Sequence, residues 1–214
     1  MEFDLDQIDA LLSTTRAVRK RLDLERDVPD EVLLECLRLA VQAPTGSNRQ
    51  GWRWLFVRDP ATKAALADLY NRGGRQYLEA SAKTVDDGSQ TGRVMDSALY
   101  LADHLAEVPV LLIPLIIGRV EDNPGVGAGL FGSIFPAVWS YQLALRSRGL
   151  GSCLTTLHLS HEAEAAELLG IPAHMTQAGL LPVAYTRGTD FKPATRPPVE
   201  EIAYLDRYKQ PFGS

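Results

Sequence analysis

The sequence has few cysteines, few histidines and no long apolar run, and each shortage excludes a class of site. Cys36 and Cys153 are the only cysteines, so a zinc site built on several thiolates is excluded and a disulfide is not expected. The four histidines form neither an HxxxH nor an HExxH pattern, and we treat them as residues that bind no metal. The longest apolar segment, residues 108–117, contains two prolines and falls short of the roughly 18 apolar residues of a membrane span. We therefore expect no metal site and no membrane-spanning segment.

A surplus of basic residues is also missing. The 22 Lys and Arg residues are outnumbered by 27 Asp and Glu residues, and the formal net charge of −5 argues against general affinity for nucleic acid phosphates. The N-terminus carries acidic residues and lacks the basic-then-apolar pattern of an export signal, so we expect a cytoplasmic protein. With 214 residues, of which 45% are hydrophobic and 23% charged, and with no internal repeat, the chain is predicted to form one domain over residues 1–214.

Residues 43–52 form a polar, turn-prone segment between two regular apolar patterns. A helical pattern precedes the segment, and an aromatic, strand-like run over residues 52–57 follows it. We expect Pro44 to end the helix, because proline disfavours helical geometry in the residue before it. The segment is either a plain helix-to-strand connection or a ligand-binding loop. Four hydrogen-bonding side chains, more than a simple turn needs, favour the loop: Thr45, Ser47, Asn48 and Gln50.

Apolar periodicity and capping signals predict the other elements. Helices are expected over residues 5–12, from Pro29 with Asp30 as cap, from Asp59 with Pro60 at the first position, and over residues 96–106, 133–148 and 161–169. Strands are expected over residues 110–117, 152–157 and 179–185. Residues 72–93 are rich in glycine and poor in large apolar residues, which predicts a mobile surface excursion of the kind that forms lids. The tail from residue 186 is polar and proline-rich, and we expect it to wrap around another surface.

Residues 127–132 match the GxGxxG dinucleotide fingerprint, but their context does not. The preceding apolar strand ends near Ile117, so a polar stretch of nine residues stands where the fingerprint needs a tight turn. About 20 residues further on, where an acidic residue should meet the ribose, the chain has the glycine-rich residues 149–153. We therefore reject a Rossmann site and attribute these glycines to flexibility or to close helix packing.

A basic run at residues 16–21 has two interpretations. It is either a solvated helix start or an anion site, because Arg16 and Arg19 are three residues apart and share a face of a helical turn. Two guanidinium groups on one face can clamp a phosphate. A second basic pair, Lys192 and Arg196, follows the last predicted strand. If the two basic elements meet in space, they can hold a phosphorylated cofactor.

Four motifs in this order resemble the flavin-dependent nitroreductases, and the resemblance covers nearly the whole chain. The Arg-Ala-Val-Arg of residues 16–19 resembles the N-terminal Arg-Ser-x-Arg element of that family, and residues 43–52 resemble its Ala-Pro-Ser-x-x-Asn-x-Gln-Pro-Trp loop. Residues 149–153 resemble its Gly-Leu-Gly loop, and residues 192–201 resemble its basic C-terminal element. Three positions depart from the pattern: Thr15 stands where many members have an arginine, Ala17 replaces a serine, and Gly51 replaces a proline.

The resemblance implies an α+β fold with a central, mostly antiparallel sheet flanked by helices and a C-terminal extension exchanged across a homodimer. FMN would lie at the subunit interface, with Arg16 and Arg196 on its phosphate, Lys192 as a helper and Arg19 near the pyrimidine edge of the flavin. Loop residues would reach the FMN held mainly by the other subunit, and a backbone amide near Thr156 would face flavin N5. The implied FMN contacts are Arg16, Ala17, Val18, Arg19, Pro44, Thr45, Gly46, Ser47, Asn48, Gln50, Thr155, Thr156, Leu157, Lys192 and Arg196.

The implied activity is an oxidoreductase that works by a ping-pong mechanism. NADH or NADPH would give hydride to FMN, and a nitroaromatic, a quinone or a related conjugated small molecule would then take the electrons. No protein side chain is expected to act as a catalytic group, because the cofactor carries the chemistry. The alternatives are a non-catalytic protein that stores FMN, and a family member with different flavin chemistry, such as dehalogenation, enone reduction or an oxygen-dependent reaction.

Overall fold

The computed structural model describes residues 2–85, 88–120 and 124–212, and it divides into two compact units. The larger unit comprises residues 16–189, and the smaller unit comprises residues 1–15 and 190–214. The larger unit contains a five-stranded sheet with packed helices, which confirms the α+β class. Within the described ranges, no helix combines the length and the apolar character needed to cross a membrane. A single domain over the whole chain stays a prediction.

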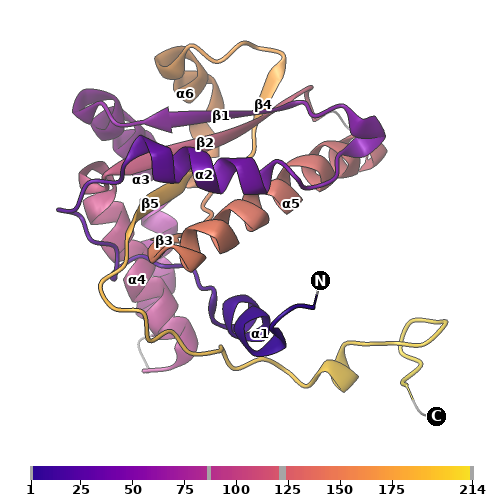
Figure 1. Ribbon diagram of the computed structural model, residues 1–214. Coiled ribbons are helices and arrows are strands. Elements are labelled where there is room, and N and C mark those ends of the chain that lie inside the picture. The colour runs from indigo at the N-terminus through magenta and orange to yellow at the C-terminus, as the bar shows by residue number, and fades with distance from the viewer. Residues whose placement is uncertain (1, 86–87, 121–123, 213–214) are drawn as a thin grey trace. The chain divides into compact units, whose positions relative to one another are not determined.

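The sheet is antiparallel at every pair of strands (Figure 1). Its order is β1 (Trp52–Val57), β2 (Val110–Ile117), β5 (Leu181–Tyr185) and β3 (Leu150–Ser152), and the short strand β4 (Met175–Gln177) also pairs with β2. β5 pairs with the first residues of β2, whereas β4 pairs with the last ones. The bounds of β1 and β2 confirm the predictions, and β4 escaped prediction because three residues are too few to show an alternating pattern.

The predicted strand over residues 152–157 is wrong, because β3 ends at Ser152. Within the described ranges, only one further bridge forms beyond this point, between Thr155 and Leu180. Opposite the gap, β5 carries Pro182, which has no N–H to donate to the ladder. The chain therefore leaves the sheet early, and the residues after β3 are free to form another structure.

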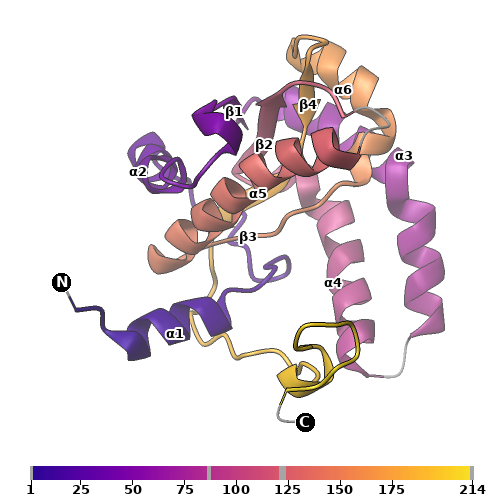
Figure 2. The same ribbon diagram turned by 90° about the vertical axis from the view of Figure 1, so that its right-hand side faces the viewer.

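β2 is the central strand of the core, and seven of its eight residues are buried. Val110, Leu112 and Ile116 share one apolar cluster with residues of α2 (Asp30–Ala40) and α5 (Pro124–Ser147). These two helices lie side by side across one face of the sheet (Figure 1). The alternate residues of β2 point to the other face, where α3 (Pro60–Thr84) and α4 (Gln90–His104) lie on the far side of the strands from α2 (Figure 2). Helices thus cover both faces of the sheet.

α5 begins nine residues before the predicted start at residue 133 and therefore contains the whole GxGxxG segment. Glycines 127, 129 and 132 are helical, whereas a dinucleotide fingerprint needs a turn between a strand and a helix. The rejection of a Rossmann site is confirmed. Pro136 lies inside α5 without ending it.

α3 and α4 contradict the predicted mobile excursion over residues 72–93. α3 continues to Thr84 and α4 starts at Gln90, and the two helices run side by side (Figure 2). The rest of that prediction falls partly on Asp86 and Asp87, which lie outside the described residues. The predicted mobile excursion is therefore wrong for the residues that the structure describes, and a lid role of this segment stays a prediction.

Gly73 and Gly74 lie inside α3, on the side that meets the short helix η3 (Leu157–His161). A Cβ atom on Gly73 would lie 2.0 Å from the carbonyl oxygen of Leu157, and one on Gly74 would lie 2.5 Å from a methyl group of the same residue. The absence of side chains at these positions thus permits a close backbone approach rather than chain mobility.

The predicted helix boundaries are partly right. Asp59 accepts a hydrogen bond from Thr62 N–H and caps α3, with Pro60 as its first residue, as predicted. α6 (Glu162–Leu169) ends at Gly170, whose φ of 64° is left-handed, also as predicted.

Two expectations about α2 are wrong. Asp30 is its first residue and not its cap, because Pro29 stands at the cap position and no side chain caps the helix. Pro44 does not end the helix, which stops at Ala40 in a tighter turn of i to i−3 hydrogen bonds.

The smaller unit contains α1 (Leu5–Thr14) and the short helix η4 (Val199–Glu201). Asp4 caps α1 by accepting a hydrogen bond from Gln7 N–H at 3.1 Å, and α1 has no buried residue. Large apolar side chains are exposed in both segments of this unit, among them Phe3 at 71% and Tyr208 at 78%.

We expect Gly73→Ala to destabilise the fold by about 1–3 kcal/mol, because the new methyl group meets the Leu157 backbone, which cannot rotate away. Urea unfolding of the variant and the wild type measures the change. Gly132→Ala is the matched control: that glycine is also helical, but no heavy atom lies within 4 Å of its added Cβ, so the control should gain up to about 1 kcal/mol. Equal stabilities for both variants would contradict the packing role of Gly73.

Candidate functional site

The basic segment over residues 16–19 is attached to β3 by its backbone. Ala17 forms a parallel bridge with Ser152, and Val18 N–H donates to Ser152 O at 2.9 Å. A Cβ atom on Gly151 would lie 2.9 Å from Val18 Cβ, so glycine allows the two segments to approach this closely. The Gly-Leu-Gly turn therefore positions the basic segment.

Arg16 and Arg19 have no carboxylate partner within the part of the chain that the structure describes. Arg16 is half-buried and has no side-chain hydrogen bond or ion pair there. Arg19 Nη1 donates to Ser97 Oγ at 3.3 Å. Other arginines of the larger unit do lie against carboxylates, among them Arg58, Arg72, Arg75, Arg119, Arg148 and Arg187. The two cations of the basic segment are thus available to an anion.

Burial keeps the thiol of Cys153, which lies near Arg19, in its neutral form. Burial raises the pKa of Cys153 to about 11, although the charge of Arg19 opposes this shift. Cys36 is also buried and free, and burial raises its pKa to about 11. Neither thiol is a thiolate near neutral pH, so neither is a ready nucleophile.

The residues after β3 place a hydroxyl and a backbone amide near the basic segment. Thr155 Oγ1 donates to the hydroxyl of Tyr70 at 3.1 Å, and both Tyr70 and Cys153 are close enough to Arg19 for its charge to affect their pKa values. The Thr156 N–H donates no hydrogen bond to any described residue. Residues 16–19 and 155–157 are therefore brought together at the end of β3, as the motif order predicts.

The loop over residues 44–50 uses several of its polar side chains internally. Thr45 Oγ1 accepts from Gln50 N–H at 3.1 Å, and Gln50 Nε2 donates to Asn48 Oδ1 at 3.0 Å. Ser47, Asn48 and Gln50 have φ values of 53°, 53° and 48°, a left-handed conformation that is costly for residues other than glycine. The polar side chains of Thr45, Asn48 and Gln50, which exceed the needs of a simple turn, therefore stabilise a turn with a strained backbone.

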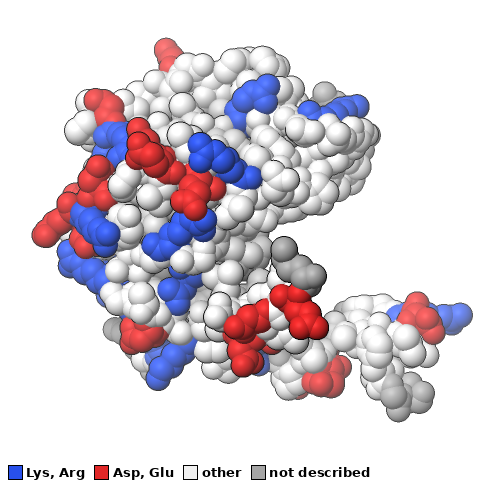
Figure 3. Space-filling model, viewed as in Figure 1, with Lys and Arg blue, Asp and Glu red and all other residues white. Residues whose placement is uncertain are grey.

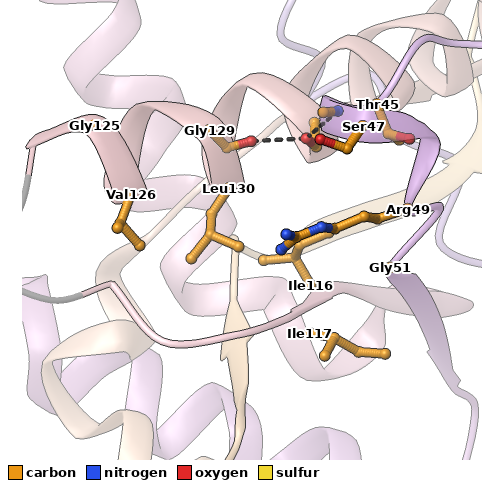
Figure 4. A pocket seen from close by; sticks show the side chains of 12 residues that line it. Thr45, Ser47, Arg49, Gly51, Ile116, Ile117, Gly125, Val126, Gly129 and Leu130 are labelled. Atoms are coloured by element: carbon orange, nitrogen blue, oxygen red, sulfur yellow. Dashed lines mark hydrogen bonds between the residues drawn. The ribbon is translucent and has the colours of Figure 1, made fainter.

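The loop is attached to α5 through Ser133, beside a cavity of about 270 Å³ (Figure 4). Gly46 N–H donates to Ser133 Oγ at 3.0 Å, and Ser133 Oγ donates to Gly129 O at 2.7 Å. The cavity lies between the loop, the N-terminal half of α5 and the end of β2. Its lining comprises Thr45, Gly46, Ser47, Arg49, Gly51, Ile116, Ile117, Gly125, Val126, Gly129, Leu130 and Ser133. Pro44, Asn48 and Gln50 are not among the lining residues.

Within one chain, the loop and the basic segment lie toward opposite ends of the sheet. Ser152, which holds the basic segment, aligns through Val183 with Val110, the first residue of β2. Gly51, which follows the loop, instead accepts a hydrogen bond from Ile117, the last residue of β2. At about 3.4 Å per residue, these positions are separated by roughly 20 Å along the strand. The structure thus assembles two separate parts of the predicted site.

Lys192 and Arg196 belong to the smaller unit. Among the described residues, the side chain of Arg196 donates only to Thr195 O, from Nη1 at 3.2 Å, and its role at a phosphate stays a prediction. The sequence analysis did not identify two residues that line the cavity beside the loop. Arg49 stood unremarked inside the loop motif, and Ser133 was a polar interruption in an otherwise apolar helix, a signal that could have identified it.

His158 is fully buried next to Leu157, and sequence analysis gave it no role. Neither of its ring nitrogens has a hydrogen-bond partner among the described residues, and Gln177 Oε1, which is also buried, has none. Burial lowers the pKa of His158 to about 4, although Gln177 and Glu162 nearby oppose the shift. The imidazole is therefore neutral at neutral pH.

Comparisons with known proteins agree with this architecture. The model of the Nitroreductase family matches residues 12–185. A 4-nitrobenzoate reductase of Nocardioides sp. is 27% identical over 196 residues, which cover 80% of this chain and 77% of the relative. An NADH dehydrogenase of Thermus thermophilus is 27% identical, and the match covers 94% of this chain and 98% of the relative.

A solved structure extends the agreement to the fold. The crystal structure of oxidized iodotyrosine deiodinase bound to FMN and 3-iodo-L-tyrosine matches with a TM-score of 0.69 at 25% identity, covering 95% of this chain and 99% of that one. The nitroreductase-like fold that the motifs predicted is therefore confirmed.

We expect the stability of the wild type to fall as the pH is lowered from about 6.5 to about 4, partly because of His158. In this pH range His158 is protonated in the unfolded chain but neutral in the folded one. The free energy of unfolding therefore falls by up to about 1.4 kcal/mol per pH unit for this one proton. Urea unfolding at several pH values should show a shallower decline for His158→Leu. His174→Leu, at an exposed position, is the control and should keep the slope of the wild type. If the stability of all three proteins fell equally with pH, His158 would not contribute to the decline.

Proposed function

The chain belongs to the nitroreductase family, and we propose that it is an FMN-dependent oxidoreductase with NADH or NADPH as electron donor. The proposed acceptor is a nitroaromatic, a quinone or a related conjugated molecule. The names of the two relatives, one a nitroaromatic reductase and one an NADH dehydrogenase, support this choice of acceptor and donor. The observation that carries the proposal lies at the end of β3: among the described residues, Arg16 and Arg19 have no carboxylate partner and the N–H of Thr156 has no acceptor.

The donor set at β3 fits FMN. Arg16 supplies a half-buried cation with no counter-ion in the described part of the chain, which suits a phosphate. Arg19 supplies a second cation that is held in place by Ser97, which suits the pyrimidine edge of a flavin, where reduction adds negative charge. The N–H of Thr156 has no partner among the described residues and can donate to a flavin nitrogen. The backbone of Ala17 and Val18 and the side chains of Thr155 and Leu157 would complete this side.

Bound FMN would supply the redox chemistry, accepting a hydride in one half-reaction and passing electrons on in the next. The residues of the chain would hold and orient the flavin. Arg19 would favour the reduced, anionic form by its charge. This division of labour agrees with the state of the two cysteines, both of which are buried and protonated at neutral pH.

We propose further that the site is completed by a second copy of the chain. The separation of roughly 20 Å along β2 supports this, because Pro44, Thr45, Gly46, Ser47, Asn48 and Gln50 would then reach the FMN of the partner. The exposed apolar side chains of the smaller unit also support a homodimer in which the C-terminal extension crosses to the partner. Exposed large apolar groups of this kind are commonly covered by another protein surface.

A second candidate reaction is reductive dehalogenation of an aromatic ring. The 25% identity and TM-score of 0.69 to a structure of iodotyrosine deiodinase favour it over the enone and oxygen-dependent alternatives. A screen that includes both nitroaromatic and halogenated phenolic acceptors separates the two reactions.

We expect the FMN-loaded protein to lose its flavin absorbance rapidly when NADH or NADPH is added without oxygen. Addition of an acceptor should then restore the absorbance, since the second half-reaction oxidises the cofactor. Stopped-flow absorbance at the flavin maximum measures both steps. A protein that stores FMN would keep its absorbance in the presence of either donor, and a colourless protein that cannot retain added FMN would contradict the proposal altogether.

We expect Arg196→Ala to weaken FMN binding by roughly 10- to 100-fold, the value of a hydrogen bond to a charged group. Fluorescence titration of the apoprotein with FMN measures the loss. Riboflavin, which lacks the phosphate, should bind equally to the variant and the wild type. Arg207→Ala, in the same exposed tail, is the matched control and should bind FMN normally. Unchanged FMN binding by the Arg196 variant would remove that residue from the phosphate site.

A further inference from the structure

Arg49 projects its side chain into the cavity between the loop, α5 and β2. Its N–H donates to Gly46 O at 3.2 Å, and its neighbours Asn48 and Gln50 both have positive φ values. The strained backbone of the loop therefore sets the direction of this side chain. Figure 4 shows the guanidinium group reaching across the cavity toward Ile116 and Leu130.

The charge of Arg49 is not neutralised by the described part of the chain. Its side chain has no ion pair or hydrogen bond there, and none of the described residues that line the cavity is acidic. Its neighbours in sequence differ: Arg53 donates to Trp52 O, and Arg58 pairs with Asp27. In Figure 3, the coloured charged atoms at the upper right of this face are basic, whereas basic and acidic atoms mix on its left side. The cavity is thus suited to a negatively charged group.

The rest of the cavity is suited to a flat apolar body. Ile116, Val126 and Leu130 supply apolar surface, and Ser47 adds a hydroxyl on the same side as Arg49 (Figure 4). Small-molecule sites are commonly apolar with a few polar groups that fix orientation. A guanidinium group binds a carboxylate through two parallel hydrogen bonds, which also fixes the plane of the ligand.

We propose that Arg49 determines acceptor specificity by binding the carboxylate of an aromatic acid, whose ring packs against the apolar wall of the cavity. The inference rests on the proposed function for the reaction, because the same loop is proposed to reach the FMN of the partner. An acceptor held here would lie beside that FMN. The binding step itself requires no turnover and can be tested separately.

The test compares 4-nitrobenzoate with 4-nitrobenzamide, which has the same ring and no charge. Binding of each compound to the FMN-loaded protein is measured by isothermal titration calorimetry without NADH or NADPH. We expect Arg49→Gln to weaken 4-nitrobenzoate binding by roughly 10- to 100-fold and to change 4-nitrobenzamide binding by less than about 2-fold. Arg49→Lys should lie between Arg49→Gln and the wild type, because lysine keeps the charge but not the paired geometry.

Arg38→Gln is the matched control, since it removes the same charge from an exposed position on α2 outside the cavity, and it should bind both compounds like the wild type. Equal losses for the two compounds, or no loss for either, would overturn the inference. So would reduced FMN retention in Arg49→Gln, because Arg49 would then serve the cofactor. Failure of NADH or NADPH to reduce the flavin would contradict the proposed function but would leave the binding comparison intact.

Discussion

The structure depends on the burial of β2, in seven of its eight residues, between two layers of helices. A strand covered on both faces offers no polar side chains to a ligand, and its backbone groups must be paired within the sheet. Binding groups can therefore lie only where the pairing stops. In this chain two such places are the end of β3, where Pro182 interrupts the ladder, and the loop beside Ile117.

Electrostatics separates the arginines that support the fold from those that are available to ligands. Arg58 and Arg148 are compensated by carboxylates, and such exposed pairs add little beyond local order. Arg16, Arg19 and Arg49 have no carboxylate partner among the described residues. An uncompensated cation binds anions more strongly than a paired one, since no existing partner must be displaced.

Close backbone approach is the second requirement of the site, and glycine provides it at two points. Gly151 lets the basic segment lie on β3, and Gly73 lets α3 lie against Leu157. Both contacts hold residues that are proposed to face the flavin. The two contacts join positions far apart in the sequence, so the chain positions this site through packing rather than through a continuous motif.

The sequence by itself determined the fold class, the two longest strands and the chemistry of the loops, because these follow from local periodicity and from motifs of neighbouring residues. It misjudged residues 72–93, since the packing that keeps Gly73 helical comes from Leu157, 84 positions further along the chain. Only the tertiary structure decided which arginines lack a counter-ion among the described residues. It also showed that the polar side chains of the loop stabilise the strained backbone of the loop itself, and that Arg49 lines a cavity. Those properties depend on distances between residues remote in sequence, and no local pattern encodes them.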